Sequence, residues 1–239
     1  MCADFLNQIN SASDAWLTMP ELRATEDHGK TISSTEPITL GFDGSEGRKI
    51  GIADATVLIG YSITQKHLFK VGIWAQPDGP AGEGWQPPRL EIEQTVRDAF
   101  ERYNIVGFYA DPSAGWAQDV KTWEAKYSRR LQAKISVAEP IRYPQRNVSQ
   151  TCENFAQLLS AIHQGLITYD GDPTMTAHFL NARKSPRQAG YVLVKPADDQ
   201  DYSKIDATWG AMFAYKAGLD AVGKGAARQT KRRAPRRLY

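Results

Sequence analysis

Two apolar segments of the sequence each end in an aspartate that is followed at once by a turn-forming sequence. Ile38 to Phe42 leads into Asp43-Gly44-Ser45, and Ile105 to Ala110 leads into Asp111-Pro112. Short apolar runs rich in β-branched and aromatic residues are typical of buried strands. Because burial of an unpaired carboxylate costs several kcal/mol, each aspartate is either a solvated turn residue or a group that a positive charge holds.

The order of the other segments predicts an α/β fold with a mixed sheet. Strand-like runs at 56–63 and 68–74 follow the first strand, as in an antiparallel meander. Beyond them we expect helices at 90–103, 116–127, 147–164 and 205–222, strands at 105–110 and 135–140, and an irregular region at 165–204 with a strand-like piece at 190–195. This order predicts a central mixed β-sheet flanked by α-helices.

A third acid, Asp206, lies in the first turn of the last expected helix. Small residues at Ala207, Ala211, Ala214 and Gly218 would let this helix lie close against the sheet. An aspartate at a helix N-terminus is also common because it complements the helix dipole. If the first and fourth strands are parallel neighbours, however, Asp206 would meet the two strand-end acids.

Acids gathered in this way predict a metal site. Like charges so close repel unless a cation lies between them, and carboxylate oxygens suit Mg²⁺ or Mn²⁺. We therefore predict Asp43, Asp111 and Asp206 as metal ligands. Asp54 opens the second strand, across the hairpin from Asp43, and is either an additional ligand or the cap of a turn.

The order strand-Asp, strand-Asp, helix-Asp after a three-strand meander resembles the ribonuclease H-like nuclease fold. The phrases GFDGS, DATVLIG, YADPSAGW and KIDATWGAMFAYKAG resemble the C-terminal nuclease domain of the large terminase subunit of tailed bacteriophages, over residues 38–222. The resemblance implies an endonuclease that cuts concatemeric double-stranded viral DNA during genome packaging, with little sequence preference. It implies Asp43, Asp111 and Asp206 as catalytic residues that hold Mg²⁺ or Mn²⁺, two ions when DNA is bound.

The same resemblance implies partners and a location. The partners would be double-stranded DNA, the terminase ATPase domain, the small terminase subunit and the portal, in the cytoplasm of the infected bacterial host. The near match to a phosphate-binding loop at 218–226 lacks the hydroxyl residue after its lysine and ends a helix instead of following a strand. We therefore expect no ATP site in this chain.

Basic and acidic residues are distributed unevenly along the chain. From Lys224 to Tyr239 there are seven basic residues and no acidic one, so the rest holds 22 basic and 27 acidic residues. We expect a leader at 1–37, a nuclease domain at 38–222 and a basic, disordered tail at 223–239, which is either a phosphate-binding arm or a solvated terminus. The residues predicted to contact DNA are Arg183, Lys184, Arg187, Lys231, Arg232, Arg233, Arg236 and Arg237.

The sequence excludes some other classes of protein and leaves two alternative functions open. The sequence has no apolar run of membrane-spanning length, no standard secretion signal, and two widely spaced cysteines that fit neither a zinc site nor a disulfide framework. Two alternatives remain: a junction resolvase or integrase of the same fold, and a non-catalytic DNA-binding or assembly module. Preference for four-way junctions would identify the first, and failure to bind Mn²⁺ would identify the second.

Overall fold

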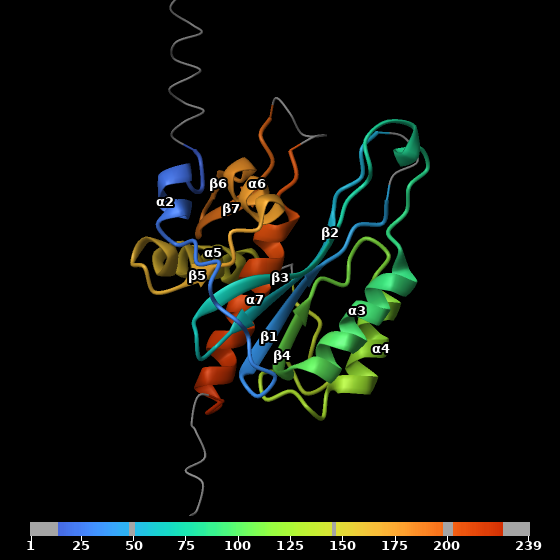
Figure 1. Cartoon of the computed structure of the whole chain (residues 1–239), viewed down its shortest axis with the longest axis vertical. Coiled ribbons are helices and arrows are strands. Elements are labelled where there is room, and N and C mark those ends of the chain that lie inside the picture. Colours follow the sequence, from blue (N-terminus) through green and yellow to red (C-terminus); the bar gives the residue numbers. More distant parts are fainter. Residues whose placement is uncertain (1–13, 48–50, 145–146, 198–202, 227–239) are drawn as a thin grey trace, which may run out of the picture.

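A computed structural model describes residues 14–47, 51–144, 147–197 and 203–226. Within these ranges a five-stranded mixed sheet has the order β4-β1-β2-β3-β5, and β6 pairs with β7 in a separate sheet (Figure 1). The strands are β1 (Pro37–Asp43), β2 (Thr56–Ser62), β3 (His67–Trp74), β4 (Asn104–Ala110), β5 (Thr168–Tyr169), β6 (Arg183–Arg187) and β7 (Gly190–Val194). The helices are α2 (Met19–Arg23), the 3-10 turn η1 (Gly79–Gly82), α3 (Arg89–Arg102), α4 (Ala117–Tyr127), α5 (Val148–His163), α6 (Pro173–Asn181) and α7 (Asp206–Gly223).

The pairing of the strands confirms the predicted meander and the parallel neighbour. β1 pairs antiparallel with β2, and β2 pairs antiparallel with β3. β4 lies on the other side of β1 and runs parallel to it. The carboxyl ends of β1 and β4 therefore meet at one edge of the sheet.

Helices cover both faces of the sheet, as predicted. Figure 1 shows α3 and α4 on one face and α7 with α5 on the other. Alternate residues of β1, namely Ile38, Leu40 and Phe42, belong to the core cluster that includes residues of α3 and α4. Since successive strand residues point to opposite faces, Gly41 and Asp43 are directed to the face that α7 covers.

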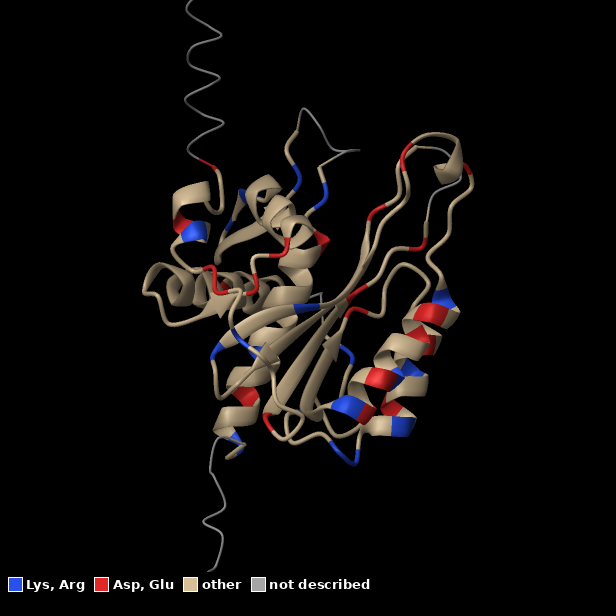
Figure 2. Ribbon diagram, in the orientation of Figure 1, with Lys and Arg blue, Asp and Glu red and all other residues tan. Residues whose placement is uncertain are grey.

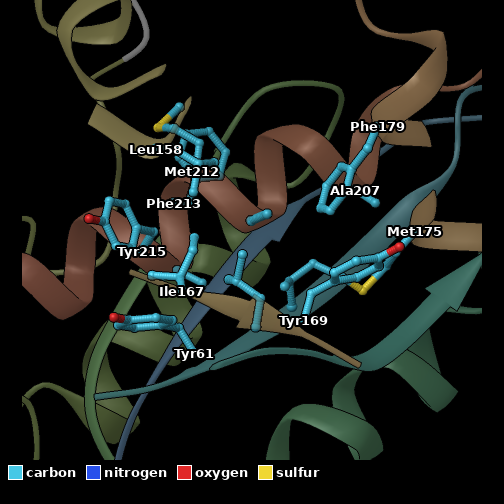
Figure 3. Packing of buried hydrophobic residues seen from close by; sticks show 14 of the residues in the cluster. Tyr61, Leu158, Ile167, Tyr169, Met175, Phe179, Ala207, Met212, Phe213 and Tyr215 are labelled. Atoms are coloured by element: carbon cyan, nitrogen blue, oxygen red, sulfur yellow. The ribbon is translucent and has the colours of Figure 1, made fainter. Parts of the chain in front are cut away.

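The last helix lies unusually close to the sheet. A Cβ placed on Gly41 would lie 2.0 Å from the carbonyl oxygen of Gly210 in α7. The Thr39 hydroxyl donates to the Ala214 carbonyl at 2.6 Å. The predicted small residues of α7 are buried at this contact, and Figure 3 shows Tyr215 of α7 beside Tyr61 of β2, with ring centroids 5.3 Å apart.

Two segments differ from the prediction. No strand forms at 135–140, because Ser136 and Glu139 close a turn there and the chain touches β4 only in the isolated bridges Ala133–Gly107 and Arg142–Ala110. In the region 165–204, expected to be irregular apart from a strand-like piece at 190–195, that piece forms β7 as predicted, and α6, β5 and β6 are present in addition. At the start of α6 the Asp172 carboxylate accepts from the Thr174 and Met175 amides, and a proline follows this cap.

The described part of the leader packs on the body. Trp16, Leu17 and Leu22 are buried in the core cluster that includes residues of α5, α6 and α7. Ala15 forms a bridge with Arg183 of β6. The proposed boundaries at 37 and 222 remain predictions. No helix in the described ranges is both long and apolar enough to cross a bilayer.

Candidate active site

The parallel pairing of β1 and β4 brings two predicted acids together. Phe42 pairs with Ala110 in the ladder, and the Asp111 amide donates to the Phe42 carbonyl at 3.0 Å. Asp43, the last residue of β1, and Asp111, the residue after β4, therefore both follow this pair directly. Figure 2 shows acidic segments where these strands end.

The turns that follow the two acids are packed against each other through Trp116. The indole Nε1 of Trp116 donates to the Ser45 carbonyl at 2.9 Å. A Cβ on Gly44 would lie 2.4 Å from this nitrogen, so no other residue fits directly after Asp43 without a shift. After the other acid, the amide and hydroxyl of Ser113 both donate to Asp111 Oδ1, which fixes the carboxylate.

The start of α7 adds the third acid. Asp206 is the first residue of α7 and is 7% exposed. Its Oδ2 accepts from the Ala55 amide at 3.2 Å, at the beginning of β2. The close contact between α7 and β1 thus places Asp206 at the face to which Asp43 is directed.

These carboxylates share one electrostatic environment. Burial first, and then the charges of Asp206, Asp111 and Asp54, raise the pKa of Asp43 well above its usual value. Burial and then Asp54 raise the pKa of Asp206 to about 6, although the Ala55 amide and Lys195 act in the opposite direction. Burial and neighbouring negative charge thus oppose ionisation of Asp43 and Asp206, a cost that a bound cation would offset.

The donor set fits a hard divalent cation, since every candidate ligand is a carboxylate oxygen. Within the described residues, no three His, Cys, Asp or Glu side chains are gathered closely enough to form a ready-made metal site. The roles of Asp43, Asp111 and Asp206 as ligands therefore remain a prediction, supported by their convergence.

Comparison with known proteins agrees with this architecture. No family model matches the chain. Gene 13 protein of Mycobacterium phage L5 is 30% identical over 90% of this chain, and the match spans 37% of that protein's length. The magnesium-bound large terminase nuclease of thermophilic phage G20c superposes with a TM-score of 0.55 at 11% identity, over 85% of this chain and 97% of that one. The large terminase of bacteriophage HK97 superposes with a TM-score of 0.59 at 12% identity, over 86% of this chain and 43% of that one.

The fold is that of the phage large-terminase nuclease domain. This result confirms the predicted ribonuclease H-like architecture. In the terminase-nuclease fold of this chain, the two strand-end acids and the helix acid lie at one edge of the sheet, as the sequence predicted.

Two lysines beside the site were missed by sequence reasoning. In this terminase-nuclease fold, Lys195 follows β7 and Lys204 precedes α7, and Figure 2 shows basic segments in the chain that links the two elements. Lys195 Nζ donates to Asp54 Oδ1, and Lys204 Nζ lies 4.0 Å from the same oxygen. Asp54 is thus engaged by two cations, which favours a charge-pairing role over metal ligation.

The residues predicted to contact DNA have varied surroundings. The Arg183 guanidinium donates to the Leu180 and Ala182 carbonyls and lies 3.8 Å from Asp14, so it holds the local fold together. Lys184 lies 5.6 Å from the ring centre of Tyr191, and Arg187 donates to Ser185 and Pro186. DNA contact by these residues remains a prediction. Lys231, Arg232, Arg233, Arg236 and Arg237 lie outside the described residues.

His178, in α6, is 3% exposed and contacts the start of α7. No residue spacing in the sequence indicates this contact, because it depends on the packing of α6 against α7.

Proposed function

We propose that this chain is the nuclease part of a phage DNA-packaging terminase and cuts double-stranded DNA in a metal-dependent reaction. The observation that carries the proposal is the convergence of Asp43, Asp111 and Asp206 at the ends of β1, β4 and the start of α7. The terminase-nuclease fold supports it, since the G20c nuclease structure holds magnesium.

Asp43, Asp111 and Asp206 would hold Mg²⁺ or Mn²⁺, two ions when DNA is bound. Such ions supply an activated water for attack on phosphorus and stabilise the leaving oxygen of the phosphodiester. The protein's own part is to position the ligands. Ser113 orients the Asp111 carboxylate and the Ala55 amide orients that of Asp206.

Positive charge beside the acids supports an anionic substrate. Lys195 and Lys204 pair with Asp54, and the charge of Lys195 also acts on Asp206. When a cation neutralises the three proposed ligands, the lysine side chains would favour a DNA phosphate at the same place.

The wider context is also a proposal. The chain spans 37% of the length of its phage L5 relative, so an ATPase would belong to another part of the polypeptide or to a partner. The terminase small subunit, the portal and the cytoplasm of the infected host follow from the same resemblance.

The test is plasmid cleavage in Mg²⁺ or Mn²⁺ against EDTA, with each proposed ligand changed to asparagine. Asp43→Asn, Asp111→Asn and Asp206→Asn should each abolish cleavage, because a lost carboxylate weakens the metal site. Asp54→Asn should still cut. Asp98→Asn is the matched control, since Asp98 is exposed in the last turns of α3, accepts from the Gln94 side chain, and lies toward the end of β4 opposite the site. A ligand variant that cuts at the parental rate would remove that residue from the site.

Two further arms test the alternatives. Linear duplex and four-way junctions are compared as substrates, because a resolvase would prefer junctions. Calorimetry with Mn²⁺ separates an enzyme from a non-catalytic module, which would bind no metal. Urea unfolding in EDTA should show the three ligand variants as stable as the parent or slightly more, since each relieves like-charge repulsion.

A further inference from the structure

The helix that carries Asp206 is not capped by its own sequence. Ile205 occupies the cap position of α7 and supplies no side-chain hydrogen bond. The first amides of a helix need acceptors from elsewhere. The Ala207 amide finds one in Nδ1 of His178, at 3.0 Å, so a side chain of α6 caps the residue next to Asp206.

Two more hydrogen bonds join α6 to the same short segment. The Thr208 hydroxyl donates to the His178 carbonyl at 3.2 Å. The Asn181 side-chain amide donates to the Lys204 carbonyl at 3.1 Å. The chain is therefore held on both sides of Asp206, at Lys204 before it and at Ala207 and Thr208 after it. Figure 3 shows Phe179 of α6 and Ala207 of α7 in the same core cluster.

The geometry requires a neutral His178. A backbone amide can only donate, so Nδ1 must accept and the ring carries its proton on Nε2. Burial, and then the charges of Lys204 and Lys195, lower the pKa of His178 to about 4, against a smaller opposite effect of Asp172. The acceptor is therefore present at neutral pH.

We propose that His178 is a positioning residue that holds the first turn of α7, and through it the Asp206 carboxylate, in the geometry that the metal needs. This inference rests on the proposed function. The Asp206 carboxylate accepts from the Ala55 amide at 3.2 Å, and Asp206 is itself the first residue of α7, so the place of the carboxylate depends on the helix start. Supporting contacts behind a metal ligand typically change metal affinity by about 10–100-fold when they are lost.

The experiment compares His178→Asn with His178→Leu. The asparagine carbonyl reaches the position of Nδ1 and keeps an acceptor for the Ala207 amide, whereas leucine fills the space without one. Met175→Ala is the control for lost packing, because Met175 is fully buried in α6 and gives no hydrogen bond to α7. Amide hydrogen exchange at the start of α7, Mn²⁺ affinity by calorimetry and plasmid cleavage are measured on all four proteins, including the parent.

We expect His178→Leu to lose exchange protection at Ala207 and to bind Mn²⁺ at least about tenfold more weakly. His178→Asn should restore both, and Met175→Ala should melt earlier but bind Mn²⁺ as the parent does. Parental Mn²⁺ affinity in His178→Leu would overturn the inference and leave the proposed function standing. Absence of Mn²⁺-dependent cleavage in the parent would overturn the proposed function and any positioning for metal, and hydrogen exchange alone would then show whether His178 holds the helix.

Discussion

Gly41→Ala tests whether the closeness of α7 to the sheet sets both the stability of the domain and the geometry of its acidic site. The added Cβ would lie 2.0 Å from the Gly210 carbonyl oxygen, 2.4 Å from the Ala214 amide nitrogen and 2.9 Å from the Cβ of Phe213. Two of these three atoms are backbone and cannot rotate away. To reach ordinary contact at 3.4 Å from the carbonyl oxygen, α7 must move by about 1.4 Å.

The cost follows from that displacement. Overpacking a core costs about 1–3 kcal/mol and occasionally more, and the backbone contacts at Gly41 put this variant near 3 kcal/mol. For a domain of this size, about 2–4 °C of melting temperature corresponds to each kcal/mol, so Tm should fall by roughly 6–12 °C. Asp206 moves with α7, so the rate of plasmid cleavage should also fall, even at temperatures well below Tm. A misplacement near 1 Å should lower that rate by about 100-fold.

The assay pairs thermal unfolding with plasmid cleavage at a temperature where every variant is folded. Gly223→Ala is the matched control, because this glycine ends the same helix and has nothing within 4 Å of an added Cβ. It should melt no earlier than the parent and cut equally well. If Gly41→Ala melted and cut like Gly223→Ala, the close contact would be irrelevant to both properties. A lower Tm with parental cleavage would separate stability from site geometry.

Three other measurements follow from charge. In EDTA, the folded state raises the pKa of Asp206 to about 6, so the folded protein binds more protons at this residue than the unfolded protein does. The contribution of Asp206 to the unfolding free energy therefore falls as pH rises from about 4 to 6. Asp206→Asn should remove this pH dependence. The pH dependence from His178 runs in the opposite direction, because its folded pKa of about 4 lies below the ordinary 6.5. Its contribution to the unfolding free energy is present above pH 6.5 and is lost as pH falls toward 4. His178→Asn should reduce that loss. Urea unfolding between pH 4 and 7 measures both, and parental pH slopes in the two variants would refute the assignments. Deletion of residues 224–239 should weaken DNA binding for all sequences alike and make the slope of log K against log salt shallower by roughly 2–5, while cleavage at saturating DNA persists; an unchanged slope would exclude the tail from DNA binding.

The parts of the fold that follow from local pattern were predictable. The β-branched runs of β1, β2 and β4 identify strands without any knowledge of their neighbours, and the small residues of α7 indicate a close helix–sheet contact. The two strand-end acids could be placed together because parallel strands that are adjacent end at the same edge. The strands and the helix contact follow from chain order and periodicity, whereas the adjacency of β1 and β4 was a condition of the prediction that only the structure supplies.

The rest depends on tertiary contacts that no spacing reveals. The apolar residues around Ile135 read as a strand, but the turn at Ser136–Glu139 prevents continuous pairing with β4. Helix α6 carried a usable signal, an aspartate cap followed by Pro173, within a region of turn-forming residues. Lys195 and His178 could not have been found, because their partners are more than 20 residues away along the chain and meet them only through docking of the β6–β7 sheet and α6.

The site is assembled from the beginning, middle and end of the described chain, and this order has a consequence for synthesis. Ribosomes deliver the chain from its N-terminus, and contacts distant in sequence form late. Asp43 and Asp111 therefore emerge with the first four strands, long before α7 exists to bring Asp206 across β1. A chain whose translation stops before α7 lacks both the third carboxylate and the helix that closes this face of the sheet, so the acidic site is complete only once α7 has been made.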